Sequence, residues 1–302
     1  MFQVIVPTLN AARDWPRFSQ SLLENVKPSQ VLVLDSESTD GTQNLVLNAG
    51  MELRTIKRAE FNHGATRQYG AEIASKADVL VYLTQDAVLA SSDVIQRLLA
   101  AFQDSEVGAV CGRQLPRIGA DAIEVHAREF NYPEVSNVRT LESRKHLGLK
   151  AAFLSNSLAA YRRSALVSIG GFPSDVIFGE DMYVAARMLL SGKKIAYVAG
   201  ACAYHSHNYT ATQEFKRYFD IGVLHSREAW LLKEFGSVQG EGKRFVLSEL
   251  RYLLKKNPVQ IPVALLRTAS KLLSYRLGRI ETKLPQSAKQ AMSMHSEYWT
   301  KY

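Results

Sequence analysis

The chain has 302 residues, of which 46% are hydrophobic and 22% are charged. These values are ordinary for a globular protein, and the length allows one large domain or two unequal ones. There is no run of about 18 apolar residues, so we expect no membrane-spanning helix.

The start of the chain and its cysteines indicate a cytoplasmic protein. Residues 1–7 lack a basic leader, and Pro7 falls where the apolar core of a signal sequence should continue. Cys111 and Cys202 lie far apart and match no metal-binding or redox spacing. They are compatible with a reducing cytosol.

The first third of the chain alternates predicted strands and helices. Short apolar segments rich in β-branched residues predict buried strands at 2–6, 31–34 and 79–83. Helices are predicted between them, over 14–26, 41–49 and 65–76, with Thr39 or Asp40 as the cap of the second. This alternation indicates an α/β fold with a parallel sheet of right-handed βαβ units.

The next elements are less regular. A helix over 92–103 with Ser91 or Ser92 as its cap precedes a strand at 107–111. The stretch 114–150 is polar, mixed in charge and weakly periodic, so we expect a partly mobile insertion. The remaining predictions are a strand at 158–161, a short helix at 164–169, a turn at 170–173, a helix at 180–191 and a strand at 195–198.

The C-terminal part predicts helices broken by Pro258 and Pro262. After the second break, six apolar residues lie within roughly 80° of one another at helical spacing: Leu266, Ala269, Leu273, Leu277, Ile280 and Leu284. The net charge of +8 is concentrated here, because residues 216–302 hold 16 Lys/Arg and 7 Asp/Glu, whereas residues 1–215 hold 21 and 22.

Two arrangements account for this basic segment. The commoner one is a helix pair packed on the main domain with its lysines in solvent. The other is a peripheral anchor, with the apolar stripe in the interface of an anionic membrane, and the charge asymmetry favours it. Nucleic acid is disfavoured, because no recognised nucleic-acid module is present.

Four motifs of acidic and small residues lie at strand ends or on adjacent turns. They are VIVPTLN at 4–10, DSESTDGT at 35–42, TQDA at 84–87 and GED at 179–181. Ligands of open α/β sheets gather at such strand ends. Together the motifs can hold a nucleotide, a metal and a catalytic base, which indicates a sugar-transfer enzyme.

These motifs resemble those of family-2 glycosyltransferases with the GT-A fold. FNHGATR at 61–67, TQDA and HSHNY at 205–209 resemble the bacterial rhamnosyltransferase branch. The resemblance covers about residues 3–210 and implies a mainly parallel central sheet with flanking helices, followed by a helical extension. We divide the chain into a nucleotide-sugar-binding half (1–113), an acceptor-binding and catalytic half (114–212) and a basic helical extension (213–302).

The resemblance assigns donor-binding residues. Pro7, Thr8 and Asn10 follow the first strand, where backbone groups can meet a base or ribose. Asp35 and Ser36 follow the next strand, and Asp35 can accept from ribose hydroxyls or a pyrimidine N–H. Asp40 can share that work, although we favour a helix-capping role for it.

A second donor-binding segment is predicted before the helix at 65–76. There Asn62 and His63 accompany Gly64, which allows close backbone approach, and Arg67, which can fork onto phosphate oxygens. A purely structural Arg67 is the competing interpretation.

The pair Gln85 and Asp86 replaces the Asp-x-Asp metal motif of the family and keeps only one carboxylate. A divalent cation, Mg²⁺ or Mn²⁺, would neutralise the leaving diphosphate. His205 or His207 can supply a second ligand, although lone histidines are mostly structural.

Glu180 and Asp181 open a helix, and the resemblance makes Asp181 the general base for the acceptor hydroxyl. The helix dipole should lower its pKa. The alternative is that both acids only satisfy the helix terminus. Ser155, Asn156 and Arg163 correspond to the acceptor side, with surface charge as the alternative for Arg163.

We therefore expect an inverting transferase that moves L-rhamnose from dTDP-L-rhamnose onto a lipid-linked saccharide in surface polysaccharide or lipopolysaccharide synthesis. It would lie on the inner face of the plasma membrane. A transferase using a UDP-hexose is the nearest alternative, and a non-catalytic saccharide- or lipid-binding module is the alternative from another class. A nucleotidyltransferase is disfavoured, because residues 7–15 lack a glycine-rich phosphate loop with a lysine.

Overall fold

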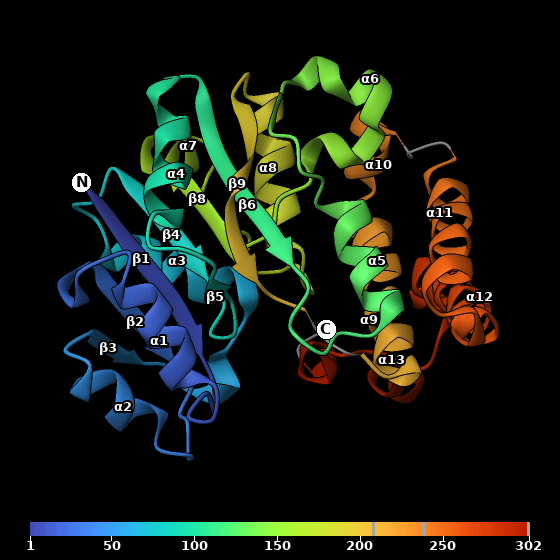
Figure 1. Cartoon of the computed structure of the whole chain (residues 1–302), viewed down its shortest axis with the longest axis horizontal. Coiled ribbons are helices and arrows are strands. Elements are labelled where there is room, and N and C mark those ends of the chain that lie inside the picture. The colour runs from blue at the N-terminus through green and yellow to red at the C-terminus, as the bar shows by residue number, and fades with distance from the viewer. Residues whose placement is uncertain (207–208, 237–239, 301–302) are drawn as a thin grey trace.

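The computed structural model describes residues 1–206, 209–236 and 240–300. These residues form one mixed sheet with helices on both faces (Figure 1). Its strands are β1 (Phe2–Thr8), β2 (Val31–Asp35), β3 (Glu52–Thr55), β4 (Val79–Leu83), β5 (Val88–Leu89), β6 (Val107–Leu115), β7 (Asn137–Arg139), β8 (Leu158–Arg162) and β9 (Lys194–Tyr204). Their order is β3-β2-β1-β4-β8-β6-β9-β5, and β7 pairs with β9.

The predicted βαβ half is confirmed. Strands β1 to β4 are parallel, with β1 between β2 and β4. Beyond β4 the sheet becomes mixed, because β8 runs antiparallel to both β4 and β6, while β6 and β9 are parallel. The short strands β3, β5 and β7 were not predicted, and β6 and β9 extend beyond their predicted ends.

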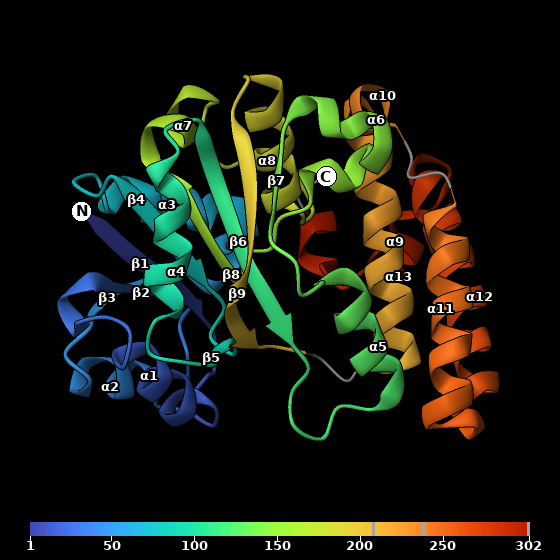
Figure 2. The same ribbon diagram turned by 45° about the horizontal axis from the view of Figure 1, so that its top comes forward.

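Helices cover both faces of the sheet (Figure 2). They are α1 (Trp15–Leu23), α2 (Thr42–Asn48), α3 (His63–Ile73), α4 (Val94–Ala100), α5 (Ala122–Asn131), α6 (Arg144–Leu147), α7 (Arg163–Ser168), α8 (Glu180–Leu190), α9 (Ala211–Arg227), α10 (Ala229–Phe235), α11 (Glu241–Lys256), α12 (Ile261–Arg279) and α13 (Gln286–Met292). Short 3₁₀ turns connect several of them.

Alternating side chains of each strand divide the core into two clusters. Val4 and Val6 pack with α1, α2 and α4 on one face, whereas Ile5 between them packs with α3, α7 and α8 on the other. Successive side chains of a strand point to opposite faces, so a continuous apolar strand is buried on both sides. Burial on both faces explains why the apolar runs identified β1, β2 and β4 correctly.

The expected irregular insertion at 114–150 is wrong in its organisation. Besides the end of β6, it contains α5, β7 and α6. Asp121 caps α5 by accepting from the Glu124 backbone N–H at 2.8 Å. Arg139, only 5% exposed, donates to the Phe153 carbonyl at 2.6 Å. Polar residues here are used in caps and buried hydrogen bonds, so apolar periodicity is a poor guide.

Two predicted helix boundaries also differ. α4 begins at Val94, and Ser91 donates to the Asp93 carboxylate at 2.7 Å instead of capping the helix. Pro262 lies in the first turn of α12 and so begins that helix instead of breaking it. Proline is accepted there because the first backbone N–H groups of a helix have no partner inside it.

The C-terminal helices are continuous with the main core. Phe219 and Val223 of α9 and Trp299 near the end of the chain are fully buried in it. α12 packs along α9, where Gly222 and Gly278 bring the two backbones together. None of the helices in the described ranges is long and apolar enough to cross a lipid bilayer.

Candidate active site

Many of the predicted site residues lie at one edge of the sheet. Thr8 and Asp35 are paired at the ends of β1 and β2. β8 runs the other way, so its first residue, Leu158, pairs with Leu83 at the end of β4. The segment before β8, the residues after β4 and the loops after β1 and β2 therefore share this edge, as expected for parallel strand ends.

Asp35 organises the loop between β2 and α2. It has no exposed surface. Its carboxylate accepts from the Thr8 hydroxyl at 2.9 Å, from the Ser38 N–H and hydroxyl at 2.8 and 2.6 Å, and from the Gln43 amide at 2.7 Å. The predicted direct contact with a nucleotide is not available in this conformation, because these four donors already surround the carboxylate. Its neighbour Ser36 is also buried and donates its N–H to the Thr8 carbonyl at 2.9 Å.

Asp40 connects this loop to the one after β1. It accepts from the Thr42 N–H at 3.1 Å and hydroxyl at 2.5 Å, and from the Ala12 N–H at 2.9 Å. The Thr42 hydroxyl is the main cause of a lowered pKa of Asp40. The favoured helix-capping role of Asp40 is wrong, because Gly41 is the N-cap of α2 and no side chain caps this helix. Asp40 instead ties the start of α2 to the loop after β1.

Asn10 lies exposed on the facing loop with a left-handed φ of 49°. Its amide oxygen accepts from the Thr39 N–H at 2.9 Å, and its own N–H donates to the Ser38 hydroxyl at 2.8 Å. Asn10 and Ser38 therefore present polar groups at the open edge, beside Pro7 and Thr8 of β1.

Gln85 explains why an amide replaces the first acid of the metal motif. Its oxygen accepts from the Leu9 N–H at 2.8 Å, and its nitrogen donates to the Leu9 carbonyl at 3.0 Å. An ionised carboxylate is an acceptor only and cannot make the second bond. Gln85 thus ties the loop after β4 to the end of β1.

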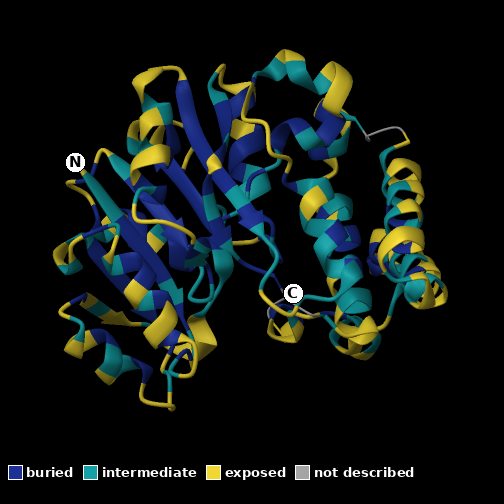
Figure 3. Cartoon of the chain, in the orientation of Figure 1, coloured by how far each residue is buried: buried dark blue, intermediate teal, exposed yellow. Residues whose placement is uncertain are grey.

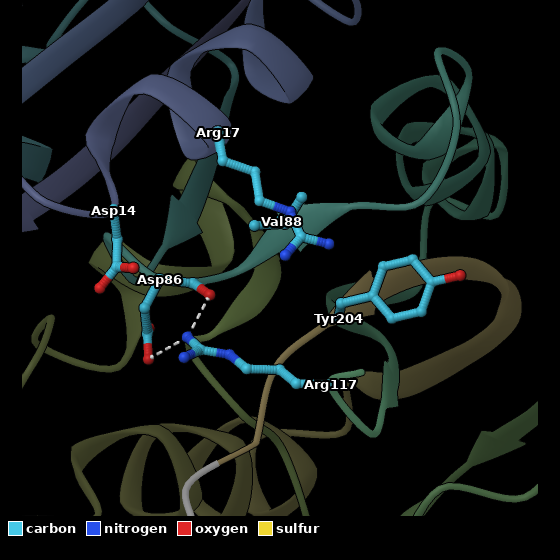
Figure 4. Close-up of a pocket in the computed structure, with 6 residues that line it drawn as sticks. All are labelled: Asp14, Arg17, Asp86, Val88, Arg117 and Tyr204. Carbon is cyan, nitrogen blue, oxygen red and sulfur yellow. Dashed lines mark hydrogen bonds and ion pairs between the residues drawn. The ribbon is translucent and has the colours of Figure 1, made fainter. Parts of the chain in front are cut away.

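Asp86 lies in a small pocket of about 50 Å³ with Asp14, Arg17, Val88, Arg117 and Tyr204 (Figure 4). Arg117 donates to the Asp86 backbone carbonyl at 2.8 Å and to Oδ2 at 3.0 Å. Nε2 of His205 lies 3.4 Å from the other carboxylate oxygen, Oδ1. The predicted pairing of Asp86 with His205 is therefore present, and His207 lies outside the described residues.

The hydrogen bonds of Gln114 fix the tautomer of His205. The amide oxygen of Gln114 accepts from Arg128 at 2.7 Å, and its amide nitrogen donates to the Ser155 hydroxyl at 2.9 Å. Nδ1 of His205 lies 3.1 Å from that oxygen and must donate to it. Nε2 then faces Asp86 either as an imidazolium N–H or as a ligand to a shared cation.

These residues fit a partial site for a divalent cation. A ligating histidine commonly donates its other N–H to an oxygen acceptor, as His205 does to Gln114. Arg117 binds Oδ2 of Asp86, so its bond does not occupy the oxygen that faces His205. Among the described residues, no group of three or more His, Cys, Asp or Glu side chains is placed to hold a metal ion. Further ligands would have to come from outside this described set, for example from the substrate or water.

Arg67 does not lie where donor phosphates could reach it. It is 5% exposed, and its guanidinium pairs with Glu180 at 3.1 Å and donates to the His63 carbonyl at 3.0 Å. The predicted phosphate contact is wrong for this conformation, and the structural alternative holds. The sequence pattern of this helix did not indicate that the Arg67 side chain would be buried.

The neighbouring residues predicted to bind the donor also have structural contacts within the chain. Asn62 caps α3 by accepting from the Ala65 N–H at 2.9 Å. A Cβ on Gly64 would lie 1.7 Å from the Pro173 carbonyl oxygen, so this glycine admits another part of the chain, not a phosphate. His63 packs against Phe61 and His295, and burial lowers its pKa to about 4.

Glu180 and Asp181 begin α8 after Gly179, whose φ of 76° suits glycine. Burial by itself would raise the pKa of Glu180, but the Arg67 guanidinium and His63 outweigh it and lower that pKa. Glu180 accepts from the Asn156 amide at 2.8 Å. It is therefore a buried, ionised anchor and not a base, which corrects its assignment as catalytic.

The pKa of Asp181 shifts in the opposite direction from that of Glu180. Its carboxylate accepts from the Met182 N–H at 2.8 Å and the Asn156 N–H at 3.2 Å. Burial and then the charge of Glu180 raise its pKa to about 6. The expected lowering by the helix dipole is wrong, because desolvation and a like charge dominate. A carboxylate with this pKa is well suited to general-base chemistry near neutral pH.

Comparison with known proteins decides the family. Residues 3–170 match the sequence model of the family described as Glycosyl transferase family 2. The chain belongs to glycosyl transferase family 2. It is also 45% identical to the O-antigen chain rhamnosyltransferase WbaN of Salmonella anatum, across 99% of this chain and 95% of that protein. The O-antigen chain rhamnosyltransferase RfbN of Salmonella typhimurium is likewise 45% identical, across 98% and 95%.

Solved structures confirm the GT-A fold of this glycosyltransferase. The mannosyltransferase PcManGT from Pyrobaculum calidifontis, in complex with GDP-Man and Mn²⁺, superposes with a TM-score of 0.58 at 21% identity, over 99% of this chain and 84% of that one. Residues 1–349 of TarS from S. aureus give a TM-score of 0.54 at 15% identity, over 93% and 91%.

The three residues predicted on the acceptor side of the glycosyltransferase do not lie together. Asn156 is buried and joins Glu180 to Asp181, and its amide oxygen accepts from the Tyr161 hydroxyl at 2.6 Å. Ser155 is bound to Gln114 at the same edge. Arg163 lies at the opposite edge, where its N–H donates to the Asp78 carbonyl before β4 at 2.8 Å. Its acceptor-side assignment is wrong, because β8 carries the chain across the whole sheet.

Several residues that contact this edge were not predicted as site residues: Gln114, Arg117, Arg128 and Tyr161. Gln114 lies in the part of β6 that was predicted as irregular chain, and Arg117 follows the end of that strand. Their partners lie 14 to 91 residues away. No local pattern marks such residues. A longer strand prediction for β6 would have placed both at the sheet edge.

Proposed function

We propose that this glycosyltransferase moves L-rhamnose from dTDP-L-rhamnose to a saccharide hydroxyl in lipopolysaccharide synthesis. Two relatives named as O-antigen chain rhamnosyltransferases, each 45% identical over nearly the whole chain, support the sugar and the setting. The observation that carries the chemistry is Asp181, with its raised pKa of about 6 at the nucleotide edge of the sheet.

In the proposed reaction Asp181 takes the proton of the acceptor hydroxyl. The acceptor oxygen attacks the anomeric carbon as the bond from that carbon to the diphosphate oxygen breaks, and the nucleotide leaves with the electron pair. Attack opposite the leaving group converts a β-linked donor into an α-linked product. Asn156 and the helix N-terminus hold the Asp181 carboxylate in place through their N–H groups, and Glu180 keeps its pKa high.

The donor nucleotide would lie at the loops after β1 and β2. Asn10 and Ser38 expose polar groups there, and Asp35 and Asp40 hold these loops together by hydrogen bonds. Asp86 and His205 would hold Mg²⁺ or Mn²⁺, which would neutralise the charge on the leaving diphosphate. Asp35 would thus hold the two loops together, in place of the direct contact with the nucleotide that was predicted for it.

The acceptor would be a growing saccharide on a lipid carrier, and the enzyme would work at the inner face of the plasma membrane. Support comes from the excess of 16 Lys/Arg over 7 Asp/Glu in residues 216–302, which suits an anionic surface.

Substitution Asp181→Asn tests the catalytic assignment. It keeps the size and the hydrogen-bond acceptor but removes the base. We expect transfer of rhamnose to fall by at least about a hundredfold, while dTDP-rhamnose still raises the melting temperature. The matched control is Asp175→Asn, an exposed carboxyl on the preceding loop, which should keep full activity. Retained transfer in Asp181→Asn would remove Asp181 as the base.

A panel of nucleotide sugars tests the donor. Melting temperatures measured with dTDP-rhamnose, UDP-hexoses and GDP-hexoses, with and without manganese or magnesium, should rise most for dTDP-rhamnose with metal. A larger rise with a UDP-hexose would reassign the donor. Equal rises without metal, together with full transfer in a chelator, would contradict the metal site at Asp86 and His205.

A further inference from the structure

The outer face of α12 is apolar and uncovered in the described chain. Leu265, Leu266, Leu272 and Leu273 are 47%, 71%, 52% and 56% exposed. Together with the exposed Ala269 they recur at spacings of one, three and four residues, so they lie on one side of the helix. We call these five residues the α12 leucine face. The outer surface of α11 and α12 is coloured as exposed in Figure 3.

The inner face of the same helix is mixed: Ala264 and Leu277 pack into apolar clusters, but several of its contacts with α9 are polar. Lys271 pairs with Glu214 of α9 at 3.0 Å, and Arg267 lies 3.7 Å from the same carboxylate. Ser274 donates to the Phe215 carbonyl. α12 therefore docks on α9 largely through charges, the Ser274 hydroxyl and glycine, and the exposed α12 leucine face is not needed for that contact.

The exposed apolar residues are also concentrated in this part of the molecule. Among the described residues, nine of the large hydrophobic side chains exposed to solvent fall between 247 and 280. They are Leu247, Leu254, Val259, Val263, Leu265, Leu266, Leu272, Leu273 and Ile280. Such a concentration of exposed apolar side chains is typical of an interaction surface.

Charge decides which partner fits. Exposed cations lie on the same two helices: Arg251, Lys255 and Lys256 on α11, and Arg276 and Arg279 on α12. A second copy of the chain would bring the same positive charge against itself in a two-fold contact. An anionic bilayer offers the opposite charge together with an apolar layer below it.

We propose that the α12 leucine face docks the enzyme on an anionic membrane, with α12 lying flat in the interface. At 1.5 Å per residue the helix is about 28 Å long. α11 and α12 form the side of the molecule farthest from β3 and α2 in both views (Figures 1 and 2). The inference rests on the proposed function for its lipid-linked acceptor, but docking can be measured without any transfer.

Flotation of the full chain with vesicles tests the proposal. We expect it to float with vesicles that contain phosphatidylglycerol and to remain behind with vesicles of phosphatidylcholine alone. The double variant Leu266→Gln/Leu273→Gln should bind the anionic vesicles at least about tenfold more weakly. Its melting temperature should not fall, because both side chains are already exposed.

The matched control is Leu47→Gln/Val167→Gln, which changes two apolar residues of the main domain that are 56% and 60% exposed. This control should float like the unmodified chain. Equal flotation of the Leu266/Leu273 variant, or equal binding to both kinds of vesicle, would overturn the proposal. So would a dimer in solution that the Leu266/Leu273 variant separates, because a second copy would then cover the face.

Hydrolysis of the nucleotide sugar distinguishes this proposal from the proposed function. The Leu266/Leu273 variant should keep hydrolysis in solution while it loses flotation, whereas Asp181→Asn should lose hydrolysis and still float. If the unmodified chain hydrolyses the donor but does not float, docking and the membrane setting fail, and the proposed transfer chemistry stands.

Discussion

Two adjacent carboxyl groups, Glu180 and Asp181, acquire different properties from their neighbours. Glu180 faces the Arg67 guanidinium, which keeps it ionised in spite of burial. For Asp181 the two N–H donors and the charge of Arg67 do not offset burial and the charge of Glu180, so its pKa rises to about 6. Environments that push apart the pKa values of two carboxyl groups assign them different roles.

The pH dependence of sugar transfer should follow the ionisation of the Asp181 carboxyl group. Because the ionised form is the base, kcat/KM should rise with pH through about 6 and be level above it. In Glu180→Gln a neighbouring negative charge is removed, so the pKa of Asp181 should fall and the rise should occur at lower pH. A pH profile of kcat/KM for both proteins measures this shift. An unchanged midpoint would show that Glu180 does not tune Asp181.

The same substitution should also destabilise the fold. Glu180→Gln leaves the Arg67 guanidinium buried without its counter-charge, which should lower the free energy of unfolding by about 3 kcal/mol. Asp93→Asn, which breaks the exposed pair of Asp93 with Arg97, is the control and should change it by less than about 1 kcal/mol. Chemical denaturation measures both, and equal losses would contradict the buried pair.

Between elements, glycine sets how closely α9 and α12 approach. A Cβ on Gly278 would lie 2.1 Å from the Phe219 carbonyl oxygen and 2.9 Å from the Gly222 Cα. Both neighbours are backbone atoms of α9, which cannot move aside as a flexible side chain can. The position of α12, and with it the outward direction of its leucines, depends on this contact.

Gly278→Ala should therefore force α12 away from α9 and lower the free energy of unfolding by about 2 kcal/mol or more. Gly242→Ala in α11 is the matched control, because a Cβ there meets nothing within 4 Å. It should leave stability unchanged or raise it by up to about 1 kcal/mol, since alanine favours helix. Similar effects of both substitutions in chemical denaturation would argue against the close helix contact.

Across the whole molecule, the C-terminal end closes back on the main domain. Trp299 is fully buried and lies against Phe219, with Arg227 5.1 Å and Lys289 4.8 Å from the centre of one of its rings. His295 stacks on Phe178, two residues before Glu180. The basic segment is therefore part of the catalytic unit and not an appended tail.

Trp299→Ala tests whether the C-terminal helices and the main domain unfold as one unit. Loss of a fully buried tryptophan should lower the free energy of unfolding by about 3 to 5 kcal/mol while unfolding remains one transition. Leu47→Ala, at a position 56% exposed, should change it by less than about 0.5 kcal/mol. Two separate denaturation transitions, with only one moved by Trp299→Ala, would instead indicate an independent C-terminal domain.

The sequence by itself determined the βαβ half, the family and the edge of the sheet where the site lies. Strands buried on both faces are continuous apolar runs, and parallel strand ends meet at one edge, so local pattern is sufficient for both. The pairing of Asp86 with a histidine after β9 and the position of Asp181 at a helix start followed from motif position in the same way.

Tertiary structure alone decided the role of each polar residue and the direction of each helix face. Arg67 pairs with a carboxylate 113 residues away, and Gly64 allows the backbone of Pro173 to approach closely. Arg163 lies at the edge of the sheet opposite the candidate site. The leucines of α12 face outward because charges and glycines occupy its contact with α9. Burial and the identity of a distant partner are properties of the packed chain, and no local spacing of residues encodes them.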